Sequence, residues 1–146
     1  NRKTSVELTN MCMIYDNQGN VLVEEKLVHN SKGLIFPGGH VEAHESFHDS
    51  VVREVKEETG LTISHPQLVG VKQFYDHNDE RYLVFFYIAE QFSGTVKESD
   101  EGKLTWMSAK ELKKQKLAYN FDHDLPVFFE QTISEHMLDG KRDELF

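Results

Sequence analysis

Three glutamates predicted to share one face of a helix are the residues of this sequence with the clearest chemical meaning. Glu54, Glu57 and Glu58 stand at positions i, i+3 and i+4, so a helix of about 3.6 residues per turn gathers them on an arc of roughly 100°. Like charges this close are unfavourable unless a cation lies among them. A hard divalent cation, magnesium (Mg²⁺) or manganese (Mn²⁺), takes oxygen ligands and keeps positions for water or phosphate. The cluster therefore predicts a metal site rather than an ordinary solvated helix face.

The residues around the glutamates are suited to hold such a helix in place. Arg53 lies one turn before Glu57, where it can form an i, i+4 ion pair and reach other carboxylates of the cluster. Gly38 and Gly39 precede the helix and permit a tight backbone turn, and Gly60 follows it as a predicted left-handed C-cap. An apolar stripe beside the acidic face is formed by Val51, Val52 and Val55. We expect a loop, helix and loop that present a rigid acidic surface.

This segment resembles the signature of the Nudix hydrolases, G-x5-E-x7-R-E-U-x-E-E-x-G-U, in which U is aliphatic. Every specified position is filled, by Gly39, Glu45, Arg53, Glu54, Val55, Glu57, Glu58, Gly60 and Leu61. The segments 36–39 (FPGG) and 101–106 (EGKLTW) also resemble the MutT-related branch, which acts on nucleoside triphosphates such as 8-oxo-dGTP. His44 is a departure, because relatives usually carry glycine there. Nine matched positions in 23 residues make a chance match very improbable.

The resemblance implies roles for the signature residues. It makes Glu54, Glu57 and Glu58 metal ligands, adds the carbonyl of Gly39, and gives Arg53 the task of orienting the carboxylates. Glu45 would fix the loop or contact the metal shell through water. The general base stays open: Glu57 is one candidate and Glu101 the other, and the nearby acidic residues of the same loop that compete with it are Glu98 and Asp100.

Residues outside the signature provide candidates for nucleotide binding. Phe36, beside the glycine turn, either lines a substrate pocket or belongs to the core, and Gly38 is assigned to the pocket. Asn120 falls where MutT-related proteins carry a purine-contacting side chain, and an amide presents both a donor and an acceptor. The alternative is that Asn120 and Asp122 cap the last helix.

Two other groups of residues have weaker claims to chemistry. His44 and His48 have the i, i+4 spacing of a zinc pair, but no second soft ligand accompanies them in the sequence. The cations before the glycine turn are interpreted as a solvated loop in preference to a phosphate contact; they are Lys26, His29 and Lys32.

Length and pattern predict one domain over residues 1–146, of class α/β, and the resemblance implies that it is a Nudix domain. The resemblance implies an α/β/α sandwich around a mixed β-sheet. Strands are expected over 6–15, 21–28, 34–36, 61–64, 67–75, 82–92 and 104–107, with a hairpin between the first two. The box helix should precede Gly60, a second helix should open at the capping-box residue Ser108, and an amphipathic last helix should span about 125–137.

Composition excludes several classes of partner. The formal net charge of −9, without a Lys/Arg block, argues against a nucleic-acid polymer, whose backbone demands a basic surface. A small nucleotide is allowed, because metal ions supply positive charge. The single Cys12 suits a reducing compartment, and the lack of an 18-residue apolar run or signal peptide argues against a membrane. We therefore expect a cytoplasmic protein, and the family includes homodimers.

The leading functional hypothesis is Mg²⁺-dependent hydrolysis of the diphosphate bond in a nucleoside diphosphate linked to another moiety. A nucleoside triphosphate, such as 8-oxo-dGTP, would give the monophosphate and pyrophosphate. ADP-ribose and dinucleoside polyphosphates are alternative substrates, although the proline and tyrosine marks of those sub-classes are missing after the signature. A non-catalytic nucleotide-binding domain on the same fold is the alternative from a different class.

Overall fold

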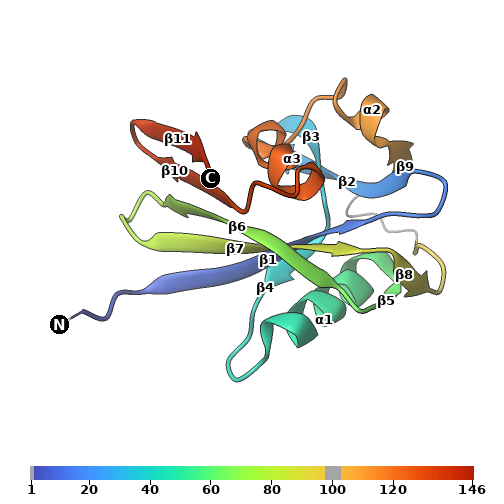
Figure 1. Ribbon diagram of the computed structural model, residues 1–146, viewed down its shortest axis with the longest axis horizontal. Coiled ribbons are helices and arrows are strands. Elements are labelled where there is room, and N and C mark those ends of the chain that lie inside the picture. Colours follow the sequence, from blue (N-terminus) through green and yellow to red (C-terminus); the bar gives the residue numbers. More distant parts are fainter. Residues whose placement is uncertain (1, 98–102) are drawn as a thin grey trace.

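A central mixed β-sheet organises the computed structural model, which describes residues 2–97 and 103–146 (Figure 1). Its six strands lie in the order β11-β10-β6-β7-β1-β4. The pairs β1/β7 and β6/β10 are parallel and the others are antiparallel. The strands are β1 (Val6–Ile14), β4 (Gly38–His40), β6 (Gln67–Tyr75), β7 (Arg81–Ala89), β10 (Glu135–Asp139) and β11 (Arg142–Leu145).

Two smaller sheets and three helices complete the fold of the described residues. One sheet is antiparallel, in the order β3-β2-β9, and the other pairs β5 with β8. Their strands are β2 (Asn20–Val28), β3 (Ser31–Ile35), β5 (Thr62–Ser64), β8 (Gln91–Ser93) and β9 (Leu104–Ser108). The helices are α1 (Phe47–Thr59), α2 (Ala109–Leu112) and α3 (Phe121–Phe129).

Both faces of the central sheet are buried, because successive side chains of a strand point to opposite sides. On β1, Met13 belongs to the core that includes residues of α2 and α3, whereas Cys12 and Ile14 belong to the core shared with α1. Figure 1 shows α1 below the sheet and α3 above it. This layered arrangement confirms the predicted α/β class and positions α1 against β1 and β4.

Several local predictions agree with the structure. The box helix ends where expected, because Gly60 adopts φ +83° and its N–H donates to the Lys56 carbonyl at 3.0 Å. Strand β6 has the predicted limits, and the Ser108 hydroxyl accepts the Glu111 N–H at the start of α2.

Three predictions about the remaining elements were wrong. The last helix is α3, which ends at Phe129, and the segment predicted to continue it pairs as β10 with β6. A helical period and a short strand were both compatible with that sequence, and sheet pairing decided between them. The expected strand over 82–92 divides near Glu90 into β7 and β8, which join different sheets. The first two strands also join different sheets. Beside the turn between them they are connected by the bridge between Tyr15 and Val21 and by the Asp16 N–H, which donates to the Asn20 carbonyl at 2.9 Å.

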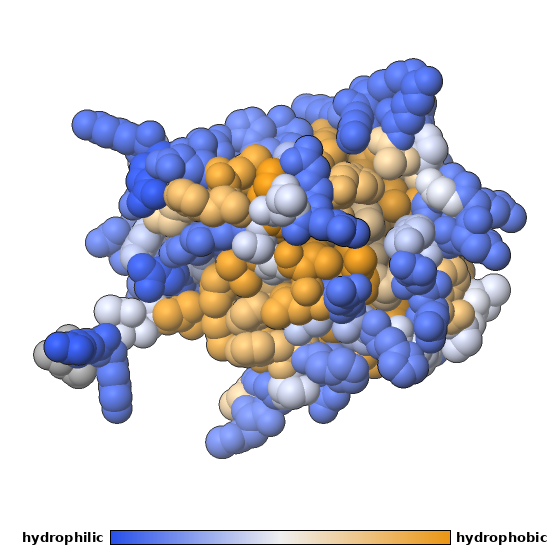
Figure 2. All heavy atoms as spheres, viewed as in Figure 1, coloured by the Kyte–Doolittle hydropathy of each residue, from blue (hydrophilic) through white to orange (hydrophobic). Residues whose placement is uncertain are grey.

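Figure 2 shows the molecule from the same side as Figure 1, with apolar residues gathered in the middle, over β6 and β7, and polar residues around the margins. None of the helices in the described part of the chain is long and apolar enough to cross a membrane.

Candidate functional site

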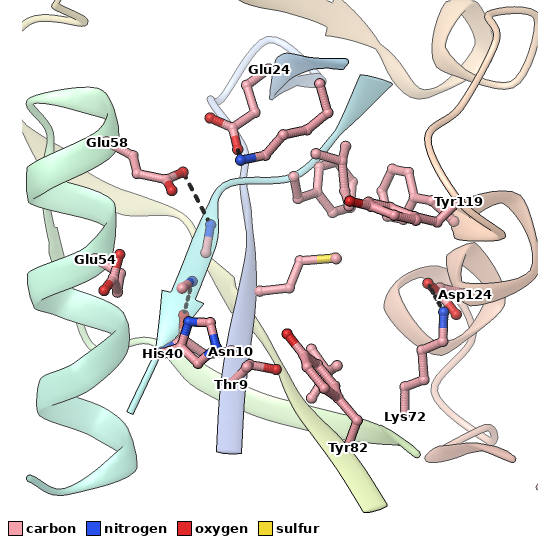
Figure 3. Close-up of a pocket in the computed structure, with 18 of the residues that line it drawn as sticks. Thr9, Asn10, Glu24, His40, Glu54, Glu58, Lys72, Tyr82, Tyr119 and Asp124 are labelled. Atoms are coloured by element: carbon pink, nitrogen blue, oxygen red, sulfur yellow. Dashed lines mark hydrogen bonds and ion pairs between the residues drawn. The ribbon is translucent and has the colours of Figure 1, made fainter. Parts of the chain in front are cut away.

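A cavity of about 880 Å³ lies between α1, the strands β1 and β4, and the start of α3. Figure 3 shows that it has two chemically different ends. Carboxylates from α1 and β2 face one end, whereas the other is bordered by Tyr119, Lys72 and Asp124. We call these the acidic end, formed by Glu24, Glu54 and Glu58, and the aromatic end, formed by Lys72, Phe74, Tyr82, Tyr119, Asn120 and Asp124.

The two glycines before α1 allow close approach of the chain to the acidic end. A Cβ added at Gly39 would lie 2.1 Å from Oε2 of Glu54, so this carboxylate occupies the space that a side chain would need. A Cβ at Gly38 would lie 2.0 Å from the Asn10 carbonyl oxygen. The Gly38 N–H points to Glu58 Oε2 at 3.4 Å. The turn therefore brings the backbone of β4 directly against two of the predicted ligands.

Arg53 orders the carboxylates on the solvent side of α1. It donates to both oxygens of Glu45, from Nε at 2.7 Å and from Nη2 at 2.9 Å, and Nη2 also donates to the His40 carbonyl. Its Nη1 donates to Glu54 at 2.8 Å and Glu57 at 3.2 Å. The hydrogen bonds from Arg53 to Glu45, together with the one from the Glu42 backbone N–H, lower the pKa of Glu45 to about 2. The predicted orienting role of Arg53 therefore has a geometric basis.

A buried asparagine connects the glycine turn to α1. Asn10, which is 4% exposed, accepts the Gly39 N–H at 3.1 Å and donates to the Ser50 hydroxyl at 3.0 Å. The Ser50 hydroxyl in turn donates a hydrogen bond to the Phe47 carbonyl at 2.7 Å. This chain of bonds fixes the distance between β4 and the first turn of α1, on which the geometry of Gly39 and Glu54 depends.

Glu24 is a second buried carboxylate at the acidic end, and it comes from β2. It is 8% exposed and lies within hydrogen-bonding reach of Glu58. Burial, followed by the repulsion of Glu58, raises the pKa of Glu24 to about 8. Burial also raises the pKa of Glu58. Two carboxylates in this position favour a cation between them.

The donor set of the acidic end fits a hard divalent cation. It offers carboxylate oxygens from Glu54 and Glu58 and backbone carbonyls of the adjacent glycine turn. Among the described lining residues, sulfur comes only from the thioether of Met11 and imidazole only from His40. Oxygen ligands are those that Mg²⁺ and Mn²⁺ prefer. The carboxylates outnumber the cationic side chains at this end, and such an ion would reduce the repulsion between them.

The aromatic end combines ring surfaces with a buried ion pair. Phe74 and Tyr82 stack with centroids 4.6 Å apart, and Tyr119 stands 71% exposed at the rim. Lys72 is 6% exposed and pairs with Asp124 at 3.0 Å. Its ammonium also donates to the side-chain oxygen of Asn120. Flat apolar surfaces with a few directed polar groups are typical of nucleobase pockets.

A buried histidine supports this ion pair from behind. His136 is 0% exposed, and its Nδ1 lies 2.6 Å from Asp124 while its Nε2 lies 2.7 Å from Asp143. These carboxylates raise the pKa of His136 above its ordinary value, against the effect of burial. His123 contacts the other oxygen of Asp143 at 2.5 Å. The network connects the terminal hairpin β10–β11 to the wall of the cavity.

The structure brings most of the predicted site residues to this cavity. Glu54, Glu58, Gly38, Gly39 and Asn120 line it. Glu57 does not; it is more exposed and stays beside Arg53. Phe36 belongs to the core, buried against two rings of α3, Phe121 and Phe128, and it also lines the cavity; its role in substrate binding stays a prediction.

Asn120 precedes α3 but makes no side-chain cap bond. Its amide instead contacts Lys72, so the capping interpretation does not hold for its side chain. Glu101 lies outside the described residues, together with the competing acids Glu98 and Asp100.

Of the weaker candidates, the possible zinc pair and the cations before the glycine turn, only one residue reaches the cavity. His44 and His48 are exposed, and His48 contacts Asp49 at 3.0 Å. His29 and Lys32 lie on the exposed β2–β3 hairpin, whereas Lys26 reaches the cavity.

Sequence reasoning missed Glu24, Lys72, Phe74, Tyr82 and Asp124 as lining residues. The only local signal for Lys72 and Glu24 was a charged residue within an otherwise β-forming segment, which is ambiguous because strands often have one solvated face.

Comparison with known proteins identifies the family of the chain. The family model described as the NUDIX domain matches residues 8–127. The chain belongs to the Nudix family. A MutT protein from Bacillus halodurans has a similar structure, with a TM-score of 0.77 and 26% identity, over 96% of this chain and 94% of that one. The Nudix signature and the fold therefore support the same assignment.

Three curated relatives carry names that bear on activity. An uncharacterised Nudix hydrolase, YvcI of Bacillus subtilis, is 40% identical over 62% of this chain and 61% of its own length. The 8-oxo-dGTP diphosphatase of Escherichia coli is 37% identical over 55% of this chain and 61% of its own length. A third relative, 32% identical over 62% of this chain and 54% of its own, is an ADP-ribose pyrophosphatase of Methanocaldococcus jannaschii. The chain thus spans less than two thirds of each of these proteins.

Proposed function

We propose that this Nudix protein hydrolyses a diphosphate bond of a nucleoside triphosphate, releasing the monophosphate and pyrophosphate, with Mg²⁺ or Mn²⁺ as cofactor. The observation that carries the proposal is a single cavity with carboxylates at one end and stacking rings at the other. A nucleotide has the matching polarity, because its phosphates need cations and its base needs a flat surface. Relatives named as diphosphatases and pyrophosphatases support the reaction class.

The proposed metal ligands are Glu54, Glu57 and Glu58, with the carbonyl of Gly39. When bound, the cation neutralises charge on the phosphate oxygens and lowers the pKa of an attacking water. Arg53 holds the carboxylates of Glu54 and Glu57 through one nitrogen, which keeps both in a single orientation. Glu45 anchors that guanidinium in turn through a two-point contact.

The general base remains a choice between Glu57 and Glu101. Glu57 accepts from Arg53 and is more exposed than its two neighbours in the cluster, so water has access to its carboxylate.

The aromatic end supports a preference among nucleobases. A lysine ammonium has donors only, so the Asn120 atom facing Lys72 must be the carbonyl oxygen. The amide NH₂ group then stays available to the cavity as a hydrogen-bond donor. We propose that it binds an acceptor on the base, such as the 6-oxo group of guanine or 8-oxoguanine, beside the stacking rings of Phe74 and Tyr82.

We further propose a cytoplasmic location, which is supported by the free, buried Cys12.

The proposal is tested by product release from a nucleotide panel with Mg²⁺. The panel contains normal and 8-oxo deoxynucleoside triphosphates, ADP-ribose, NADH and diadenosine polyphosphates, and Glu57→Gln serves as the blank. We expect the highest kcat/KM with a guanine or 8-oxoguanine triphosphate, and a loss of at least a hundredfold in Glu57→Gln. A higher kcat/KM with ADP-ribose or a dinucleotide would contradict the proposal that the substrate is a nucleoside triphosphate. Binding without any turnover would reject the enzyme and favour a nucleotide-binding domain.

A further inference from the structure

Glu24 is the one residue of the acidic end that lies outside the Nudix signature. It belongs to β2, whereas Glu54 and Glu58 belong to α1, so the two groups approach the cavity from different sides. Figure 3 shows its carboxylate turned toward Glu58. Strands alternate their side chains, and the next residue, Glu25, has a separate contact with Lys32 at 4.0 Å. From this strand Glu24 therefore points into the acidic end together with Lys26, two residues further on, whereas Glu25 does not line the cavity.

The surroundings of Glu24 leave its charge poorly compensated. Its ion-pair partner in the described part of the chain is Lys26, at 3.6 Å, and that side chain is 47% exposed. Facing it from α1 is the carboxylate of Glu58, with Glu54 one turn away. A solvated lysine contributes little, and adjacent buried carboxylates require a shared cation or a shared proton. Glu24 is thus placed as an oxygen ligand would be.

We propose that Glu24 is a further ligand of the divalent cation held by the signature glutamates. It would bind from the side opposite α1, so the ion would be clamped between the helix and β2 rather than resting on the helix face. This inference rests on the proposed function, because it assumes that Glu54 and Glu58 bind the ion. It adds a ligand from a strand, thirty residues before Glu54 in the sequence.

Mn²⁺ binding measures the proposed ligand directly. Free Mn²⁺ is followed by electron paramagnetic resonance during titration of the wild type, Glu24→Gln, Glu25→Gln and Glu54→Gln. We expect Glu24→Gln to raise the Kd for Mn²⁺ by at least about tenfold, the scale on which groups around a metal affect its affinity. Glu25→Gln is the matched control on the same strand and should leave Kd within about twofold of the wild type.

The series separates failure of this inference from failure of the proposed function. If Glu54→Gln weakens Mn²⁺ binding and Glu24→Gln does not, Glu24 is not a ligand and the signature site stands. If neither variant changes the Kd, the proposed metal site itself is wrong.

Thermal unfolding without metal checks that Glu24→Gln folds. The glutamine amide can donate to Glu58, so we expect a midpoint equal to or above that of the wild type, and a smaller rise on adding Mn²⁺. A lower metal-free midpoint with an unchanged Mn²⁺ shift would assign Glu24 a structural role and overturn the proposal.

Discussion

Replacing Lys72 by methionine tests both the stability and the selectivity assigned to the aromatic end. Lys72 and Asp124 are 8% and 2% exposed in their side chains, and their charged atoms lie 3.0 Å apart. Removing one partner of a buried ion pair costs about 3–5 kcal/mol, because the other charge is left buried. Asp124 keeps its contact with His136 at 2.6 Å, so we expect a loss at the lower end, about 3 kcal/mol.

Urea unfolding at pH 7 measures this loss as a lower midpoint with an unchanged slope. Lys32→Met is the matched control, because Lys32 is 76% exposed and its pair with Glu25 spans 4.0 Å. Such surface pairs contribute less than about 1 kcal/mol. A Lys72→Met loss no larger than that of the control would refute the reasoning from burial.

Lys72→Met should also release the Asn120 amide. With no ammonium to hold its oxygen, the side chain can turn and present either a donor or an acceptor. We expect the ratio of kcat/KM between guanine and adenine triphosphates to fall several-fold toward one. An unchanged ratio would show that Asn120 does not read the base, even if the stability loss is found.

Two glycine-related substitutions give further predictions. Gly39→Ala should keep the fold, because its Cβ meets only the end of the Glu54 side chain, yet reduce Mn²⁺ affinity at least tenfold; Gly38→Ala, whose Cβ meets backbone at 2.0 Å, should unfold the chain in circular dichroism. Equal effects of the two would contradict this contrast. His44→Gly should raise the free energy of unfolding in urea by about 0.5 kcal/mol, because His44 adopts φ +64°. The control His48→Gly, inside α1, should lower the free energy of unfolding by about 0.5–1 kcal/mol. A lower free energy of unfolding in His44→Gly would show that His44 causes no backbone strain.

The parts of the site that could be predicted from the sequence are those whose residues lie close together along the chain. Glu54, Glu58 and Arg53 lie on one helix, whose period and caps are local properties, and the structure places them as predicted. The departure at His44 was also visible, and its positive φ gives the physical reason for glycine in relatives. Local rules failed at the chain end, where residues 135–138 pair with β6. No local signal reports a partner strand some sixty residues away.

The same argument explains why Glu24 could not be recognised from the sequence. Glu24 and Glu25 are identical neighbours in one strand, and only the tertiary structure decides which of them faces Glu58 and which contacts Lys32. The register of β2 against β3 and β9, with Glu24 opposite Ile35 and Leu104, fixes that choice. A shift of one residue would exchange the two side chains. The acidic end of the cavity therefore depends on strand pairing in the β3-β2-β9 sheet, which lies outside the Nudix signature.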